Sequence, residues 1–265
     1  MAIAIAQMHI TPGQPKTNLN LMLELIDRAR NQGAEMILFP ELAISGLLLG
    51  DLAAEEIFIA ECLSAGYQLA QAARDIMVVY GNLDYRDGQL YNAVYLAYNG
   101  ENGRLSAPCG ASYVAGAYER FGEAREFQAY NLPVDGKIYR IGFVLGDWRH
   151  DAIPFAAADI DLLVNLSQKP LALDDGGEPA LIPGRQYISV NSCCAANSGK
   201  TCYLFPGGSF YLDFDGQPIA RAAMLQPDLC LWMRRGGALC PRPDEAQLLA
   251  EALVAGVRLF TAQIG

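Results

Sequence analysis

Short apolar runs alternate with one amphipathic pattern in the first part of the chain. Residues 2–8 form an apolar run that stops before Thr11-Pro12-Gly13, as expected of a buried strand followed by a turn. Apolar residues then recur at three- and four-residue spacing up to Gly33, which predicts an amphipathic helix. Residues 36–39 are a second buried strand. The order strand, helix, strand predicts parallel pairing of the two strands.

The pattern in the rest of the chain predicts a second helix, then several strands, and finally a terminal helix. The expected helices cover residues 53–73 and 245–262, and the expected strands cover residues 76–80, 90–98, 138–145, 160–166, 187–190, 209–214, 219–222 and 229–233. Asn99-Gly100 and Asp215-Gly216 are hairpin signals, whereas residues 104–127 predict a long loop with a partial helix. Because no linker or composition break divides the chain, we predict a single α/β domain with two sheets.

Glu41 is the first candidate for chemistry. Pro40 ends the apolar run at residues 36–39 and places Glu41 at the carboxyl end of the predicted strand, where open α/β sheets build their sites. Two interpretations remain open for this carboxyl group. It is either a catalytic acid–base group or an internal acceptor that holds the amides of nearby loops.

Composition excludes several classes of protein. Of the 265 residues, 52% are hydrophobic and 18% are charged, so the chain can bury a large core and is not disordered. A net charge of −10 argues against nucleic acid and anionic membranes as partners. Apolar runs are all shorter than the roughly 20 residues that span a bilayer.

Cysteine and histidine usage indicates the compartment and argues against a metal site. The seven cysteines are odd in number, contain no CxxC pair and follow no signal peptide, which favours free thiols in a cytoplasmic protein. His9 and His150 are the only histidines, so no zinc site is expected. We also expect no cofactor.

Six short segments stand out, in order along the chain: Ala4-Ile5-Ala6-Gln7, Gly33-Ala34, Leu38-Phe39-Pro40-Glu41-Leu42-Ala43, Tyr91-Asn92-Ala93, Asn165-Leu166-Ser167 and Gly207-Gly208-Ser209-Phe210. Together they resemble the nitrilase (carbon–nitrogen hydrolase) superfamily, and within it most closely the glutamine amidohydrolase domain of glutamine-dependent NAD synthetase. Residues 251–258 resemble the helix that leads into the synthetase domain, but no Ser-Gly-Gly pyrophosphate loop occurs. We therefore expect residues 1–265 to form one nitrilase-like domain with no synthetase domain following.

The resemblance implies a four-layer α-β-β-α sandwich that associates into homo-oligomers, dimers or larger. It also implies a Glu–Lys–Cys site for amide hydrolysis. In that chemistry the cysteine attacks the amide carbon, the glutamate transfers its proton and the lysine stabilises the oxyanion. Glu41 stands at the position of the glutamate.

The other two catalytic positions depart from the family pattern. The lysine should lie in residues 107–111, but the four lysines are Lys16, Lys137, Lys169 and Lys200. Arg104 is the nearest cation, and its planar fork substitutes poorly for an ammonium group. Gly146 stands at the position of the nucleophile, with Asp147 beside it. We interpret Gly146 as a vestigial nucleophile position, while an ordinary turn at a strand end remains an alternative.

Other residues are candidates for a vestigial or rebuilt pocket. Cys109 is either a relocated nucleophile or an ordinary thiol, since no nearby His or Lys would lower its pKa. Asp147 and His150 form either an acid–base pair or a solvated pair. The remaining candidates for the pocket are Tyr113, Asn165 and Ser167.

Two functional hypotheses follow. The first is a catalytically inactive member of the superfamily that acts as an assembly or regulatory partner, of itself or of an active glutaminase or NAD synthetase. The second is an amide hydrolase or small-amide-binding protein with a site rebuilt around Glu41.

Overall fold

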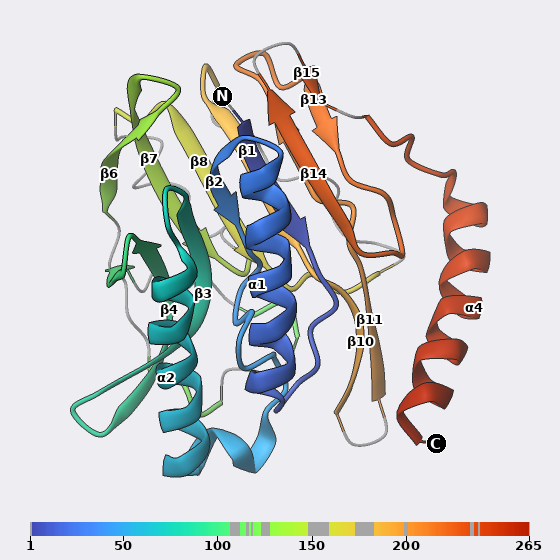
Figure 1. Cartoon of the computed structure of the whole chain (residues 1–265). Helices are drawn as coiled ribbons and strands as arrows, with labels where there is room; N and C mark the ends of the chain where they lie inside the picture. The colour runs from blue at the N-terminus through green and yellow to red at the C-terminus, as the bar shows by residue number, and fades with distance from the viewer. Residues whose placement is uncertain are drawn as a thin grey trace.

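The computed structural model describes residues 2–106, 112–114, 117, 119–122, 128–147, 159–172, 183–198, 201–233, 236–237 and 239–264. Its elements form two large sheets, one hairpin and helices on the outside (Figure 1). The first sheet has the strand order β15-β14-β1-β2-β3-β4-β5. Its strands are β1 (Ala2–Gln7), β2 (Ala34–Leu38), β3 (Met77–Arg86), β4 (Gln89–Tyr98), β5 (Glu101–Ser106), β14 (Asp228–Met233) and β15 (Gly236–Gly237).

The second sheet has the strand order β13-β12-β9-β8-β7-β6. Its strands are β6 (Ala129–Val134), β7 (Lys137–Leu145), β8 (Leu162–Ser167), β9 (Gln186–Asn191), β12 (Phe210–Leu212) and β13 (Pro218–Arg221). The central strands β7, β8 and β9 run parallel, so their carboxyl ends meet at one edge of the sheet. β10 (Cys193–Ser198) and β11 (Thr201–Pro206) form a separate antiparallel hairpin.

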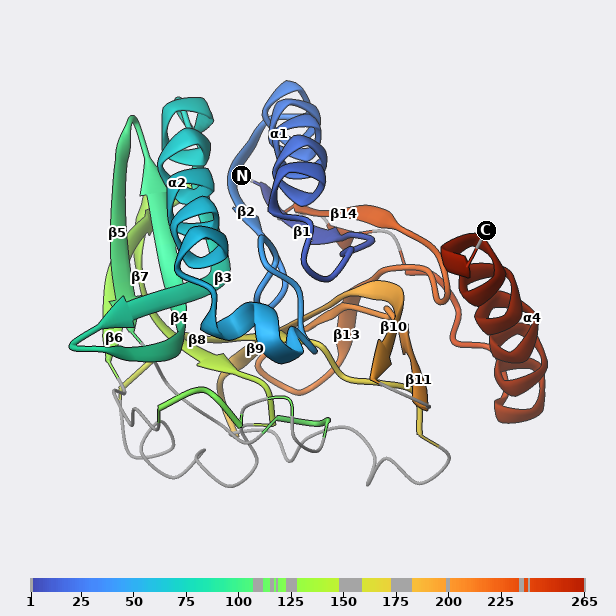
Figure 2. The same ribbon diagram turned by 90° about the horizontal axis from the view of Figure 1, so that it is seen from below.

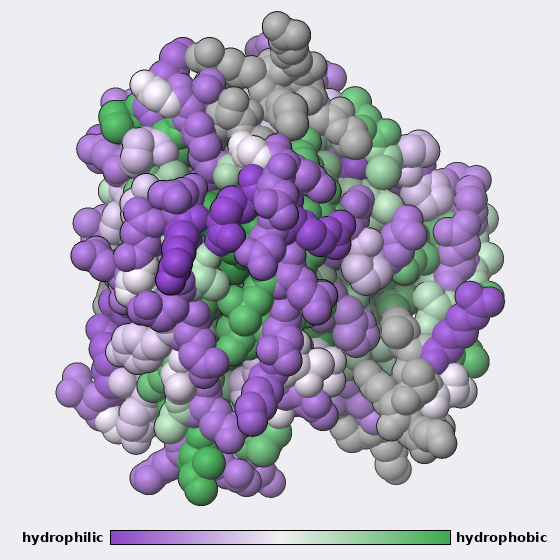
Figure 3. All heavy atoms as spheres, in the orientation of Figure 1, coloured by the Kyte–Doolittle hydropathy of each residue, from purple (hydrophilic) through white to green (hydrophobic). Residues whose placement is uncertain are grey.

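The two large sheets pack face to face. Their inner faces form one apolar cluster, to which Ile5 and Leu38 contribute from the first sheet and Phe143 and Val164 from the second. α1 (Pro15–Asn31) and α2 (Glu56–Ala72), with η1 (Gly50–Ala54) between them, cover the outer face of the first sheet (Figure 2). The exposed side of these helices is mostly hydrophilic (Figure 3). The predicted parallel pairing of β1 and β2 around α1 is confirmed.

The outer face of the second sheet is buried as well, with Val144, Leu163 and Tyr187 in a smaller apolar cluster. No described helix lies against this face, and the connections at residues 148–158 and 173–182 are outside the described residues. α4 (Glu245–Ile264) instead contacts the hairpin of β10 and β11 at one side of the sandwich (Figure 2). The expected α/β class with two stacked sheets is confirmed.

Three details differ from the sequence prediction. β3 does not end at Tyr80 but continues through Gly81 to Arg86, because it pairs with β4 along its whole length. The loop predicted at residues 104–127 is wrong at its start, because Arg104 lies in β5 and pairs with β4. The sequence reading also missed β6 and the β10–β11 hairpin, whose polar and small residues carry little alternation.

Among the described residues, no helix is both long and apolar enough to cross a membrane.

Candidate functional site

A tight turn after β2 positions Glu41. The backbone of this turn is hydrogen-bonded to β3: the Gly81 N–H donates to Pro40 O at 3.2 Å, and the Ala43 N–H donates to Gly81 O at 2.9 Å. Leu42 takes up a left-handed conformation with φ +44°. A Cβ atom at Gly81 would lie 2.5 Å from Leu42 N and 2.7 Å from Glu41 Cα, so only glycine allows this approach.

The carboxyl group of Glu41 is enclosed and hydrogen-bonded. The residue is 2% exposed. Asn92 Nδ2 donates to Glu41 Oε1 at 2.6 Å, and the Gln168 N–H donates to Oε2 at 3.1 Å. The Gln168 side chain also donates to the backbone oxygen of Glu41 at 2.8 Å. Glu41 therefore connects the first sheet, through Asn92 on β4, with the segment that follows β8.

Burial dominates the electrostatics of this group. Removal from water raises the pKa of Glu41 from 4.5 to about 8, and the hydrogen bonds from Asn92 and Gln168 oppose the rise only in part. Glu41 therefore holds a proton near neutral pH. A strongly raised pKa is typical of acid–base groups, but it also occurs for structural carboxyl groups.

The end of β7 supplies no nucleophile. Gly146 lies directly after β7 in a left-handed conformation with φ +60°, which glycine adopts without strain. Its N–H donates to Leu166 O at 3.1 Å, and Asn165 Nδ2 donates to Gly146 O at 3.3 Å. Asp147 beside it is buried. Cys109 and His150, which the sequence suggested as alternatives, lie outside the described residues.

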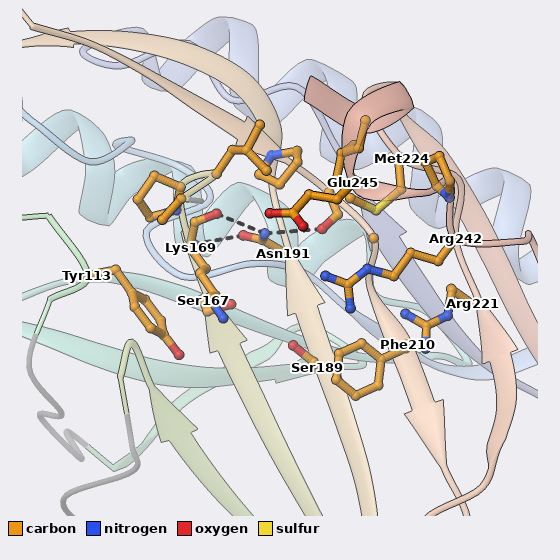
Figure 4. Close-up of a pocket in the computed structure, with 18 of the residues that line it drawn as sticks. Tyr113, Ser167, Lys169, Ser189, Asn191, Phe210, Arg221, Met224, Arg242 and Glu245 are labelled. Atoms are coloured by element: carbon orange, nitrogen blue, oxygen red, sulfur yellow. Dashed lines mark hydrogen bonds between the residues drawn. The ribbon is translucent and has the colours of Figure 1, made fainter. Parts of the chain in front are cut away.

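A cavity of about 420 Å³ opens at the carboxyl edge of the second sheet (Figure 4). Three residues suggested from the sequence line it: Tyr113, Asn165 and Ser167. Glu41, Gly146 and Asp147 are not among its described lining residues, but the lining residue Asn165 is hydrogen-bonded to Gly146. Its other end is formed by Glu245 and Leu248 of α4.

One row of the outer face of the second sheet forms the floor of this cavity. Asn165 on β8 pairs with Ser189 on β9, Ser189 pairs with Phe210 on β12, and Phe210 pairs with Arg221 on β13. The next row pairs Ser167 with Asn191. Asn191 is held by Ser209, whose hydroxyl accepts from the Asn191 N–H at 2.9 Å. The floor is therefore polar near β8 and becomes aromatic and cationic near β13.

The amide oxygen of Asn165 is buried and has no hydrogen-bond partner among the residues that the structure describes. Asn165 is 2% exposed, and its nitrogen is used by Gly146 O. Unsatisfied acceptors of this kind are uncommon in folded proteins.

Tertiary structure brings three cations to the cavity that sequence reasoning did not assign to a site: Lys169, Arg221 and Arg242. Asn191 positions the backbone of Lys169, because its Oδ1 accepts from the Lys169 N–H at 2.9 Å and its Nδ2 donates to Lys169 O at 3.1 Å. Lys169 Nζ lies 5.7 Å from the centre of the Tyr113 ring. The only sequence signal for Lys169 was its place two residues after the Asn165-Leu166-Ser167 match.

The described residues offer no cluster of metal ligands. Among the described residues, no group of three or more His, Cys, Asp or Glu side chains could hold a metal ion. Cys193 and Cys194 are buried in the β10 strand, and burial raises the pKa of Cys194 to about 11. These buried thiols are packing residues.

Comparisons with known proteins agree with this architecture. The carbon–nitrogen hydrolase family profile matches residues 2–107. Glutamine-dependent NAD(+) synthetase from Aquifex aeolicus is 25% identical over 86% of this chain and 41% of its own length. The synthetase from Xanthomonas campestris pv. campestris is 29% identical over 82% of this chain and 40% of its own length. The chain thus spans about two fifths of the length of these relatives.

Solved structures show the same fold. Glutamine-dependent NAD+ synthetase from Acinetobacter baumannii superimposes with a TM-score of 0.84 at 20% identity, covering 100% of this chain and 52% of that one. An amidase of the nitrilase superfamily from Nesterenkonia AN1 superimposes with a TM-score of 0.73 at 22% identity, covering 94% of this chain and 93% of that one. Residues 2–107 thus match the carbon–nitrogen hydrolase family, the chain is similar in sequence to glutamine-dependent NAD(+) synthetases, and it shares its fold with these solved structures.

Proposed function

We propose that this protein is a carbon–nitrogen hydrolase homologue that does not hydrolyse amides and that acts as an assembly or regulatory partner. The carrying observation is Gly146 at the end of β7. In a structure of the E41Q mutant of the Nesterenkonia sp. AN1 amidase, the acetamide moiety of fluoroacetamide is added covalently at the active-site cysteine. The sequence resemblance places Gly146 at the nucleophile position, and glycine has no side chain that could form this bond.

Arg104, the cation nearest in sequence to the expected position of the lysine, forms an ion pair with Asp84. Arg104 Nε lies 2.7 Å from Asp84 Oδ2, and Arg86 Nε contacts the same oxygen at 2.8 Å. Lys169 lines the cavity, but a cation without a nucleophile stabilises no tetrahedral intermediate. The protonated Glu41 alone does not supply the roughly 10⁶-fold or larger acceleration typical of enzymes.

A rebuilt amide site is the second candidate function. Two observations favour it: Glu41 is a buried acid with a pKa of about 8, and Asn165 and Ser167 line a cavity next to its loop. Cys109 and Asp147 were the suggested partners of such a site. In this case the protein would bind or cleave small amides through a nucleophile that is not at residue 146.

Ammonia release distinguishes the two proposals. We expect no ammonia above the background of the Glu41→Ala variant when the purified protein is incubated with glutamine, acetamide, butyramide or acrylamide. Ammonia release that depends on Glu41 would contradict the inactive assignment and favour the rebuilt site. A circular dichroism spectrum of Glu41→Ala that matches the unmodified protein serves as the folding control.

The assembly part of the proposal draws support from α4. Leu253 and Val257 are each 64% exposed, and Val254 is 51% exposed. Exposed apolar side chains that gather on one helix are typical of a surface that a partner covers. We propose a second copy of this chain as the first partner, with an active glutaminase or NAD synthetase as the alternative.

Substituting this surface should change the oligomeric state. Leu253→Lys is expected to shift the protein from dimer or larger assembly to monomer in light scattering coupled to gel filtration, because it places a charge in an apolar contact. Gln247→Lys adds the same charge at an exposed polar position of α4 and should leave the assembly intact. A monomer in the unmodified protein would contradict self-assembly through α4.

A further inference from the structure

The cavity between the second sheet and α4 is cationic in a protein that is strongly acidic. The chain carries a net charge of −10, yet Lys169, Arg221 and Arg242 all line this cavity. Among the described lining residues, these three cations are accompanied by one carboxylate, that of Glu245. Such a local excess of positive charge favours an anionic ligand.

The cations lie at two ends of the cavity. Lys169 and Tyr113 are at one end, and Arg221 and Arg242 extend from the opposite side towards the middle (Figure 4). In the sheet, Lys169 follows β8 and Arg221 lies on β13, which is three strands away. Three strand spacings amount to roughly 14 Å between backbones, a separation that the inward-reaching side chains shorten. A compact single anion cannot contact both ends at once.

Neutral groups occupy the floor between the two ends. Ser189 lies next to Phe210 in the sheet register, and the Arg221 guanidinium lies 5.3 Å from the centre of the Phe210 ring. The Phe210 contact orients Arg221 along the floor. On the other side of Ser189 lies Asn165, whose amide oxygen lacks a donor among the described residues.

We propose that this cavity binds a small acid that carries two anionic groups and a hydroxyl or amino group between them. One anionic group contacts Lys169, and the other contacts Arg221 and Arg242, whose planar guanidinium groups match a carboxylate or phosphate. The hydroxyl or amino hydrogen supplies the donor that Asn165 lacks, beside the Ser189 hydroxyl. A cavity of about 420 Å³ accommodates a ligand of this size.

Three matched probes test the ligand class by isothermal titration calorimetry on the full chain. 3-Hydroxyglutarate has two carboxylate groups and a hydroxyl group between them. Glutarate lacks the hydroxyl group, and 3-hydroxybutyrate lacks the second carboxylate group. We expect 3-hydroxyglutarate to bind most tightly and 3-hydroxybutyrate to bind about tenfold or more weakly, because a single carboxylate cannot contact both cationic ends at once. Equal affinity for 3-hydroxyglutarate and 3-hydroxybutyrate would overturn the proposal that the ligand carries two anionic groups. Equal affinity for 3-hydroxyglutarate and glutarate would overturn the proposal that Asn165 accepts a hydrogen bond from the ligand's hydroxyl group.

Substitutions test the two ends separately. Lys169→Met and Arg242→Gln should each lower the affinity for 3-hydroxyglutarate about tenfold, and each should reduce its advantage over 3-hydroxybutyrate. Lys137→Met removes a cation from the exposed start of β7 and should change neither value. Affinity that falls equally in all three variants would indicate attraction by overall charge and would overturn the proposed site. Binding of 3-hydroxyglutarate in this cavity does not require amide hydrolysis. The ammonia assay therefore tests the proposed function, and calorimetry tests the proposed ligand, so either proposal can be refuted without the other.

Discussion

Glu41→Gln should remove most of the pH dependence of stability between about pH 5 and about pH 9. The carboxyl group of Glu41 ionises near 4.5 when exposed in the unfolded chain and near 8 in the folded protein. Between these values the folded state holds a proton that the unfolded state has released. Stability of the unmodified protein therefore falls as pH rises through this window and levels off above the folded pKa.

The expected size of this effect is several kcal/mol, since one unit of pKa difference corresponds to about 1.4 kcal/mol. Glutamine is neutral at every pH and has nearly the same shape as glutamic acid, so the variant should be the more stable protein above about pH 8. Urea titrations near pH 5 and near pH 9 give the two free energies of unfolding for each protein.

Glu24→Gln is the matched control, because Glu24 lies on the exposed side of α1. This variant should keep the pH dependence of the unmodified protein. If Glu41→Gln keeps the pH dependence too, then Glu41 is ionised in the folded state near neutral pH, and the raised pKa is wrong.

Gly81→Ala should destabilise the protein by about 3 kcal/mol or more. The added Cβ would lie 2.5 Å from Leu42 N, 2.7 Å from Glu41 Cα and 2.9 Å from Glu41 C. All three are backbone atoms of the turn that holds Glu41, so no side-chain rotation relieves the clash. The turn must move away from β3, which breaks the hydrogen bonds between Gly81 and its neighbours Pro40 and Ala43.

Gly103→Ala is the comparison within the same sheet. Gly103 lies in β5, and a Cβ atom there meets nothing within 4 Å. Its free energy of unfolding, measured by thermal or urea denaturation, should stay within about 0.5 kcal/mol of the unmodified protein. Equal effects of the two alanines would show that the turn after β2 can shift, and the strict geometry assigned to Glu41 would then be wrong.

Patterns that are local in the chain predicted much of the fold. The three- and four-residue spacing before Gly33 predicted α1, and the apolar runs on either side predicted β1 and β2 with parallel pairing. The loss of the family lysine from residues 107–111 and the glycine at residue 146 are likewise visible without coordinates. Such features can be predicted because each depends on residues that are neighbours in the chain or in an aligned motif.

Features that depend on pairing between distant strands could not be predicted in this way. The sequence predicted that a strand ends just before Gly81, but β3 continues because β4 pairs with it. Residue 81 is glycine because the Glu41 turn leaves no space for a Cβ atom. The burial of Glu41, which raises its pKa, and its hydrogen bonds from Asn92 and Gln168, which lie 51 and 127 positions further along the chain, arise only in the folded structure. Neither contact leaves a periodic signal in the sequence.

The cavity depends on tertiary structure most of all. Asn165, Ser189, Phe210 and Arg221 come from four strands and become neighbours only through the register of the second sheet. Arg242 and Glu245 join them because α4 packs beside the β10–β11 hairpin. In the sequence these residues are isolated charges and polar groups, since the energy that gathers them is the burial of apolar strand faces elsewhere in the sandwich.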